Sequence, residues 1–533
     1  MMTKFTRKLS AVEIEIARNR LESIAEEVGM ALIRTSYSPN IKDRRDCSSG
    51  LYTPDGQLIS QAEHIPLHLG LMPRLIGAAV REYGVNLLEP GDVLMTNNPY
   101  LGGSHLPDIC VITPVFVETK LIALVANMAH HVDVGGMTPG SMTAHASEIF
   151  QEGVRIPPLR LMSRGKIQNE VLSLLLTNIR THEKTRGDLM AQVAANRLGE
   201  RRVHELIEEW GTGRFHESCR ALVEYTERRT RAAIDRLPNG EGVFTDTLEH
   251  NGVAPEEIKI TARVRVSGSQ LSVDLTESDG HAEGAVNCSY AVSEACVAYV
   301  VKMLADPTLP SNAGLMAPIT VETEPGTVVS ATFPAPVAQG NIQTAQRIVD
   351  ALLGAFHQIA PGQVPAASNG SMSIVTIGGL DPHSGEYYSY VETYGGGQGA
   401  LPDLDGASAV HTHMTNTRNT PCEVIEREYP LRVERYEIAR DTGGNGRHRG
   451  GDGLRRELTV TRGRAVATAA TSRVEAGPWG LSGGEAGSPA RVHFIGEQGP
   501  SELDSMSRVD LHEGEGLSIQ TAGGGGYGAP QGE

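Results

Sequence analysis

The chain has 533 residues and a formal net charge of −17 at pH 7, and 40% of its residues are hydrophobic. Because single hydrophobic cores stop growing at about 250–300 residues, this length predicts more than one domain. The acidic charge argues against binding to nucleic acid or to anionic membranes. Six scattered cysteines without a CxxC pair favour reduced thiols and a cytoplasmic protein. No apolar run approaches the ~18 residues of a membrane span, so we expect none, and Met1–Ser10 does not have the pattern of a signal peptide.

A long helix is predicted near the beginning of the chain. Ser10 and Glu13 form a capping-box pattern, and apolar residues then recur at helical spacing to about Thr35. A polar loop that contains Asp43 and Asp46 follows this helix.

A β-hairpin is predicted over residues 108–130. Two apolar runs of β-strand length flank the break Glu118-Thr119-Lys120. If the turn centres on this break, Asp108 and His130 are cross-strand neighbours with Cβ atoms roughly 4.5–5.5 Å apart. His105 lies three residues before Asp108, in the glycine-rich turn that leads into the same strand.

One carboxylate and two imidazoles therefore converge at the open end of the hairpin, which is the beginning of a metal site. Nitrogen and oxygen ligands together favour Mn, Zn or Fe over Ca and Mg. Either Asp43 or Asp46 could supply a further carboxylate ligand. The alternative interpretation is that these are ordinary polar residues at strand ends.

Composition and periodicity divide the chain into three regions. Residues 1–240 contain the predicted helices and the metal candidates, and Leu237-Pro238-Asn239-Gly240 breaks the chain at their end. Residues 241–430 mix strands and helices, and residues 431–533 are rich in β-strands with frequent glycine turns. The sequence thus predicts a multi-domain α+β protein.

Other histidine and glycine motifs carry weaker signals. His64 and His68 are separated by a proline, so we interpret them as hydrogen-bonded loop residues, and the pair His411 and His413 is a weak chelating pattern. No Gly-x-x-x-x-Gly-Lys-Ser/Thr phosphate loop occurs. The segment 443–451 resembles an anion-binding loop in composition, but a cluster of turns is the preferred interpretation.

Several segments closely resemble signature motifs of the hydantoinase B/oxoprolinase family. They extend over nearly the whole chain and are Ser38–Asp46, His64–Gly70, Asn98–Asp108, Ala129–Gly136, Pro139–Ser141, Asn416–Glu423, Gly443–Gly451 and Gly523–Gly528.

This family includes N-methylhydantoinase B subunits, a related half of 5-oxoprolinases, caprolactamase, and the α subunits of acetone and acetophenone carboxylases. In such systems ATP is bound and spent by an A-type ATPase subunit, and the B-type subunit carries a metal site. The resemblance implies that His105, Asp108 and His130 are metal ligands. It favours Asp46 as the fourth ligand over Asp43, because family members often have glutamate at the latter position.

The function that the resemblance implies is ATP-dependent opening of a cyclic amide by a hetero-oligomer of A and B subunits. The partner would phosphorylate the amide oxygen of a hydantoin or lactam, and water activated by one divalent metal would attack the amide carbon. His131 or Asp133 would orient this water or accept its proton. The alternatives are a subunit of an ATP-dependent ketone carboxylase and a non-catalytic scaffold for the ATPase partner.

Overall fold

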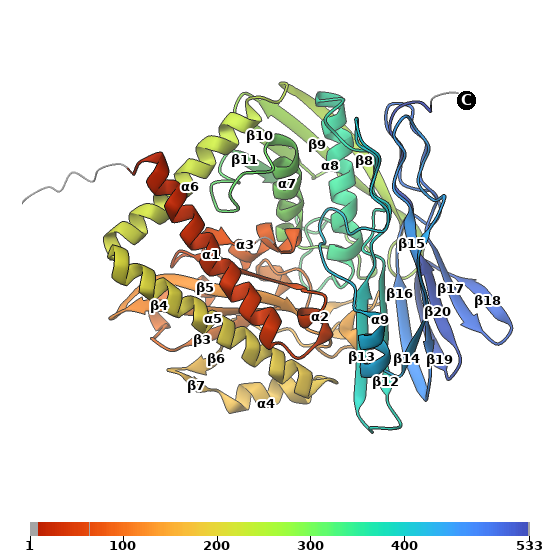
Figure 1. The fold of residues 1–533 in the computed structure, drawn as a ribbon, viewed down its shortest axis with the longest axis horizontal. Helices are drawn as coiled ribbons and strands as arrows, with labels where there is room; N and C mark the ends of the chain where they lie inside the picture. Colours follow the sequence, from red (N-terminus) through yellow and green to blue (C-terminus); the bar gives the residue numbers. More distant parts are fainter. Residues whose placement is uncertain (1–8, 63, 531–533) are drawn as a thin grey trace, which may run out of the picture.

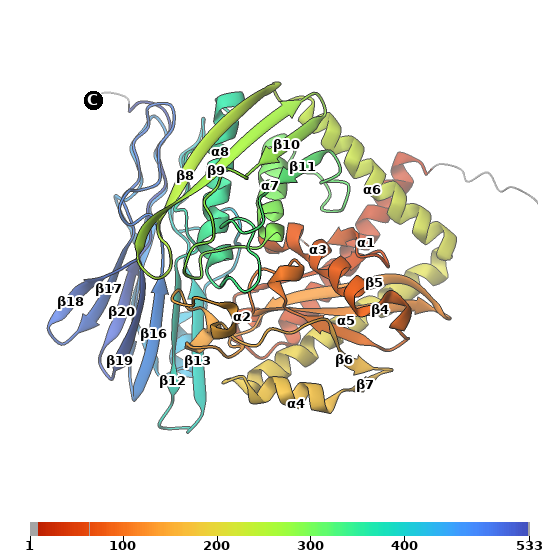
Figure 2. The same ribbon diagram turned by 180° about the vertical axis from the view of Figure 1, so that it is seen from behind.

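The computed structural model describes residues 9–62 and 64–530 (Figure 1). Most of Met1–Ser10, the segment considered above for a signal peptide, lies outside the described residues. In these described residues, helices and four separate β-sheets occur together, which confirms the predicted α+β, multi-domain class. The N-terminal sheet with its helices lies on one side of the molecule, and the C-terminal strands form a layer on the other (Figure 2). Within the described residues, no helix combines the length and the apolar character needed to cross a bilayer.

The predicted N-terminal helix is α1 (Ala11–Thr35), and it begins with the predicted capping box. The Ser10 hydroxyl accepts a hydrogen bond from the Glu13 amide at 3.3 Å, and the Ser10 amide donates to Glu13 Oε2 at 2.8 Å. These bonds satisfy amide groups that the first turn leaves without partners. The described residues also form α2 (Pro39–Lys42), α4 (Asn169–Thr177), α6 (Thr212–Ile234), α9 (Cys422–Glu428), and the short η1 (Val85–Leu87), η2 (Pro99–Leu101), η3 (Pro139–Ser141) and η4 (Ile149–Gln151).

A seven-stranded antiparallel sheet carries the candidate metal ligands. Its strands lie in the order β2-β1-β5-β4-β3-β6-β7. They are β1 (Cys47–Tyr52), β2 (Leu58–Gln61), β3 (Val93–Thr96), β4 (Asp108–Val117), β5 (Lys120–His130), β6 (Leu159–Ser163) and β7 (Lys166–Ile167).

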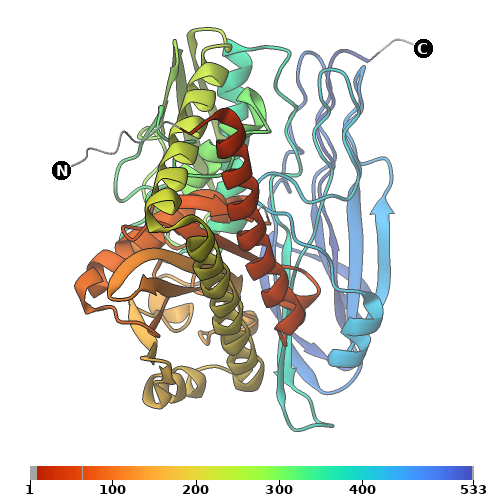
Figure 3. The same cartoon turned by 60° about the vertical axis from the view of Figure 1, so that its left-hand side comes forward.

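Helices cover both faces of this sheet. On one face, α1 and α5 (His182–Trp210) run side by side across the strands (Figure 3). On the other face lies α3 (Pro66–Tyr83), together with the middle region. Successive side chains of a strand point to opposite faces. Ile109 therefore packs against α5, whereas Cys110 packs in the core that contains α3.

The hairpin β4–β5 has the predicted register at its open end, where Asp108 lies opposite His130. The turn itself is tighter than predicted, because Val117 pairs directly with Lys120. If the pairing continued regularly from Val117 and Lys120, Asp108 would lie opposite Ala129 and not opposite His130. A bulge leaves Ile122 without a cross-strand partner and shifts the pairing by one residue. The bulge thus brings the carboxylate and the imidazole together.

The middle region is built on a four-stranded sheet in the order β11-β10-β9-β8, which packs against α8. Residues of α3, α7 and α8 share one large hydrophobic core with this sheet. The elements are β8 (Gly240–His250), β9 (Pro255–Ser267), β10 (Gln270–Asp274), α7 (Tyr290–Ala305), β11 (Ile319–Glu322), the π-helix η5 (Gly340–Thr344) and α8 (Ala345–Ile359).

The C-terminal layer consists of two sheets, in the orders β13-β12-β16-β19 and β14-β15-β20-β17-β18. Their strands are β12 (Ile374–Leu380), β13 (Tyr387–Thr393), β14 (Leu431–Ala439), β15 (Gly453–Val460), β16 (Arg464–Ala470), β17 (Arg491–Gly496), β18 (Gly499–Leu503), β19 (Met506–His512) and β20 (Gly516–Gln520). β12 and β13 precede residue 430, yet β12 pairs with β16. The C-terminal layer therefore includes strands from the region predicted as a separate middle domain.

Extended glycine-rich segments complete the C-terminal part. The Gly444 amide donates to Gly524 O at 2.9 Å, and the Gly524 amide donates to Gly451 O at 2.8 Å. A Cβ atom on Gly524 would lie 2.0 Å from Gln398 O, so the backbones approach too closely for any side chain here. The segment 443–451 is therefore part of a layer of packed extended segments and not an isolated cluster of turns.

Candidate metal centre

Three predicted ligands meet at one end of the seven-stranded sheet. Asp108 begins β4, His130 ends β5, and His105 lies in the loop that follows η2. Each of the three residues offers a ligand atom within 4.8 Å of those of the other two. His105 Nε2 lies 3.2 Å from Asp108 Oδ2, and the two imidazole rings meet edge to face with centroids 5.0 Å apart.

The Asp108 carboxylate is buried, with 2% of its surface exposed. Oδ2 accepts a hydrogen bond from the Ser104 hydroxyl, and Oδ1 has no hydrogen-bond partner among the described residues. Burial alone would raise the pKa of this carboxyl, but the imidazoles of His105 and His68 outweigh burial and hold the pKa well below its usual range. The site thus keeps a buried negative charge with one oxygen free to bind a cation.

His105 is held in one orientation by the backbone. Its Nδ1 lies 3.3 Å from Ala338 O, which is only an acceptor, so Nδ1 carries the proton. In a neutral imidazole the lone pair of Nε2 then faces the Asp108 carboxylate, and two acceptors oppose each other. Burial lowers the pKa of His105, but Asp108 outweighs this effect and raises it. A proton or a metal cation between these atoms removes the conflict.

His130 has the protonation state that a metal requires. Burial lowers its pKa to about 4, although the nearby Asp46 carboxylate acts in the opposite direction. The imidazole is therefore neutral at pH 7, and neutral imidazole is the form that binds metals. The Asn40 side-chain amide lies 3.4 Å from its Nδ1.

The two predicted candidates for a fourth ligand lie in different places. Asp46 is 9% exposed, lines the same cavity as His105 and Asp108, and accepts the His130 amide at its backbone oxygen at 3.0 Å. Asp43 is half-buried beside Lys42, Arg427 and Glu428, and it does not line this cavity.

The predicted proton-transfer residues, His131 and Asp133, do not line the cavity either. His131 follows His130 directly and therefore points to the opposite face, where its Nε2 lies 3.0 Å from Gln192 Oε1 of α5. Asp133 accepts the amides of Gly135 and Gly140 and pairs with Arg180 at 3.0 Å. His131 thus contacts α5 and Asp133 supports the loop after β5, and neither reaches the candidate metal ligands.

Two residues that the sequence did not single out for the site belong to it. His68, interpreted above as a loop residue, lies in the first turn of α3 and is 1% exposed. Its Nδ1 lies 2.9 Å from Ser48 Oγ, and its Nε2 lies 3.9 Å from Asp108 Oδ2. Asn341 of η5 places its Nδ2 3.5 Å from His105 Nε2, and its Oδ1 has no partner in the described part of the chain. Sequence spacing could not reveal the contact between Asn341 and His105, because 236 residues separate these two side chains.

His411 and His413 do not form a chelating pair. His411 Nε2 lies 3.3 Å from the Thr417 hydroxyl, whereas His413 Nδ1 lies 3.4 Å from the Tyr299 hydroxyl. The two imidazoles thus serve different contacts.

Comparison with known proteins agrees with the motif analysis. The family model described as hydantoinase B/oxoprolinase matches residues 10–530. The chain is 36% identical to 5-oxoprolinase 1 of Arabidopsis thaliana over 97% of its own length, but it spans only 42% of that protein. It is 32% identical to a Pseudomonas protein provisionally described as the B-type subunit of a D-/L-hydantoinase, covering 98% of this chain and 91% of the relative.

Solved structures share the fold over almost the whole chain. The ATP-dependent caprolactamase of Pseudomonas jessenii superimposes with a TM-score of 0.91 at 28% identity, covering 98% of this chain and 92% of that one. An acetone carboxylase chain superimposes with a TM-score of 0.88 at 18% identity, covering 97% and 75%, and this likeness shows the fold alone. The chain belongs to the hydantoinase B/oxoprolinase family.

Proposed function

We propose that the chain is the metal-binding B-type subunit of an ATP-dependent cyclic amide hydrolase. The convergence of His105, Asp108 and His130 in one buried cluster is the observation that carries this proposal. A lactam-opening relative with the same fold supports the substrate class. The unpartnered oxygen of Asp108 and the opposed acceptors of His105 and Asp108 support a bound cation.

A donor set of two imidazoles and carboxylate oxygen suits Mn, Zn or Fe. His105, Asp108 and His130 would hold the ion, and Asp46 is a further carboxylate that lines the cavity. Bound there, the metal would lower the pKa of a water molecule towards about 7, so that hydroxide is available at neutral pH.

The surrounding residues would prepare this chemistry. Ala338 O fixes the orientation of the His105 ring, and the Ser104 hydroxyl fixes Asp108 Oδ2. The Asp46 carboxylate lies 3.7 Å from the Arg44 guanidinium and lines the cavity. From this position one Asp46 carboxylate oxygen would accept a proton from the attacking water.

ATP would be used by an A-type ATPase partner in a hetero-oligomer. The partner would transfer phosphate from ATP to the amide oxygen, which removes the amide resonance and makes the amide carbon electrophilic. After water adds to this carbon, the ring C–N bond would break with the amine as leaving group, and a second water would hydrolyse the resulting acyl phosphate to a carboxylate and phosphate. The match to less than half of a 5-oxoprolinase supports a division of labour, because the remaining length of that protein leaves room for a second activity.

Reconstitution with the A-type subunit tests the proposal. We expect ADP formation coupled to ring opening when ε-caprolactam, 5-oxoproline or hydantoin is supplied, and loss of ring opening in the His105→Ala complex. Full activity of that variant would contradict the metal mechanism. Carboxylation of a ketone in the presence of bicarbonate, without ring opening, would favour a carboxylase, and normal ATP turnover with neither product would favour a scaffold.

A further inference from the structure

A single segment of the middle region contacts both nitrogens of the His105 ring. Residues 337–342 lead into η5, a π-helix, and π-helical turns are frequent at functional sites. Ala338 O lies 3.3 Å from His105 Nδ1, and Asn341 Nδ2 lies 3.5 Å from His105 Nε2. The backbone that orients the ring therefore also sets the position of Asn341 beside the ligand atom.

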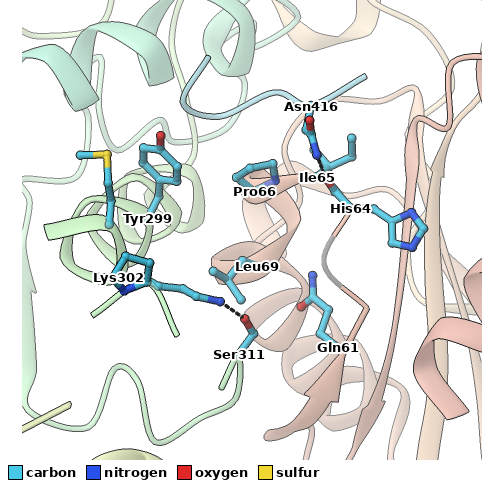
Figure 4. A pocket seen from close by; sticks show the side chains of 11 residues that line it. Gln61, His64, Ile65, Pro66, Leu69, Tyr299, Lys302, Ser311 and Asn416 are labelled. Atoms are coloured by element: carbon cyan, nitrogen blue, oxygen red, sulfur yellow. Dashed lines mark hydrogen bonds between the residues drawn. The ribbon is translucent and has the colours of Figure 1, made fainter. Parts of the chain in front are cut away.

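Asn341 carries the one carboxamide among the described residues that line the cavity of the metal centre. This cavity has a volume of about 30 Å³, roughly the space of one water molecule or one ion. Figure 4 shows a larger pocket of about 320 Å³ beside it, and Ile65 lies between the two spaces. The carboxamides of that pocket, Gln61 and Asn416, do not line the cavity. Asn341 is therefore the carboxamide placed to reach an ion there.

The contact between Asn341 and His105 is long for a hydrogen bond, but it suits two ligands of one ion. Hydrogen bonds from nitrogen usually measure about 2.7–3.2 Å. Nitrogen and oxygen ligands lie about 2.0–2.2 Å from an ion such as Zn, so two of them at tetrahedral or octahedral angles are about 2.8–3.6 Å apart. His105 Nε2 lies 3.2 Å from Asp108 Oδ2 and 3.5 Å from the Asn341 carboxamide, and both distances fall in this range.

A half-turn of the Asn341 carboxamide presents its oxygen to the ion. Nδ2 now faces the lone pair of His105 Nε2, and an N–H group in that place repels a cation. The C=O and NH₂ ends of a carboxamide have nearly the same shape, so rotation about the Cβ–Cγ bond exchanges them. Oδ1 has no hydrogen-bond partner within the described residues, and the rotation therefore breaks only the long contact with His105. The oxygen then takes the position of Nδ2, beside the ligand atom of His105.

We propose that Asn341 Oδ1 is a further ligand of the ion, and that this ligand raises the affinity of the centre for Mn relative to Zn. With Asp46, His105, Asp108 and His130 it makes five ligand side chains. Zn is almost always held by four, whereas Mn favours more ligands and suits carbonyl and carboxylate oxygen. The carboxamide is neutral, so it adds a ligand while the two carboxylates balance the charge of a divalent ion. This inference rests on the proposed function, because it completes the metal centre of that reaction.

Titration of the chelator-treated full chain with Mn and with Zn tests the proposal. Asn341→Leu should weaken Mn binding by more than about tenfold and Zn binding by less than about threefold, because four ligands suffice for Zn. Loss of a residue that merely supports the other ligands would weaken both ions alike. Asn341→Asp retains an oxygen and should keep the ratio of Mn to Zn affinity at or above that of the natural chain.

Gln343→Leu is the matched control. Gln343 is a buried carboxamide residue of the same π-helix, but it does not line the cavity, so its loss should leave the affinity ratio unchanged. The visible spectrum of the Co-substituted chain gives a second readout, because Co with fewer ligands absorbs more strongly. Asn341→Leu should strengthen this absorption, and Gln343→Leu should not.

The failure of this inference is distinguishable from the failure of the proposed function. Equal weakening of Mn and Zn in Asn341→Leu, or no weakening of either, would overturn the role of Asn341 and leave the metal centre intact. No binding of either ion by the natural chain would overturn both.

Discussion

Glu152 is a buried carboxyl group that supports the candidate metal centre through the backbone. Its Oε1 accepts the amides of Val337 and Ala338 at 2.6 and 2.8 Å, and Ala338 O contacts His105. Its Oε2 has no partner within the described residues. Burial raises the pKa of Glu152 to about 8, although the two amide hydrogen bonds act in the opposite direction.

This shift predicts a pH-dependent stability. Below pH 4.5, the usual pKa, Glu152 is protonated in both the folded and the unfolded chain, and between that value and about 8 only the folded chain retains the proton. Its contribution to the free energy of unfolding is therefore lost as pH rises from about 4.5 to 8. Glu152→Gln keeps the acceptor and stays neutral at every pH. We expect the difference in free energy of unfolding, variant minus natural chain, to be at least about 1 kcal/mol larger at pH 8 than at pH 5. Urea unfolding at both pH values measures this gain, and a constant difference would contradict the assignment.

Among the individual residues of the site, the sequence revealed the candidate ligands that one hairpin brings together. Strand pairing places Asp108 beside His130, and the preceding loop supplies His105. His68 and Asn341 approach from α3 and η5, so only tertiary packing shows their proximity. Alternation along the strand explains why His130 lies at the site and adjacent His131 contacts α5 instead.

Among the elements, the glycine-rich extended segments depend most strictly on residue size. A Cβ atom on Gly524 would lie 2.0 Å from Gln398 O, and that contact is backbone and cannot rotate away. We expect Gly524→Ala to lower the free energy of unfolding by about 1–3 kcal/mol or more. Gly213→Ala is the matched control, because a Cβ atom there meets no described atom within 4 Å, and its effect should stay below about 0.5 kcal/mol. Similar losses in both variants, measured by chemical unfolding, would show that close packing is not the cause.

Periodicity predicted the helices and the hairpin, but it gave no indication of this glycine layer. The segments have neither a helical nor an alternating pattern, and their hydrogen bonds run between residues far apart in sequence, such as Gly444 and Gly524. The sequence did not predict the bulge at Ile122 either, because an apolar residue fits either a regular or a bulged strand.

Across the whole molecule, a buried ionic cluster ties the C-terminal layer to the middle region. Arg473 follows β16 and donates to Asp246 of β8 and to Asp350 of α8 at 2.6 and 2.8 Å. Arg473 is 5% exposed, and its two acceptors are buried as well. The sequence predicted the two regions but not this contact, which crosses more than 200 residues between β8 and Arg473.

Removal of Arg473 takes away the guanidinium that donates hydrogen bonds to both buried carboxylates, and leaves them only the more distant Arg347, 3.9 Å from each. We expect Arg473→Met to cost about 3–5 kcal/mol of unfolding free energy. Arg164→Met provides the comparison, because Arg164 pairs with Glu89 on the surface, where ion pairs contribute roughly 0–1 kcal/mol. Thermal and urea unfolding of both variants measure the difference, and an equally mild effect at Arg473 would argue against a connecting role.

The metal content of the purified full chain tests the central claim most directly. Elemental analysis after gel filtration should find close to one equivalent of Mn, Zn or Fe per chain, with nearly complete loss in His105→Ala and Asp108→Asn. His182→Ala removes a half-exposed histidine outside the cluster and should retain the metal. Circular dichroism of each variant verifies that the chain is folded. Metal retained in both ligand variants, or absent from the natural chain after loading with each of the three ions, would contradict the metal centre.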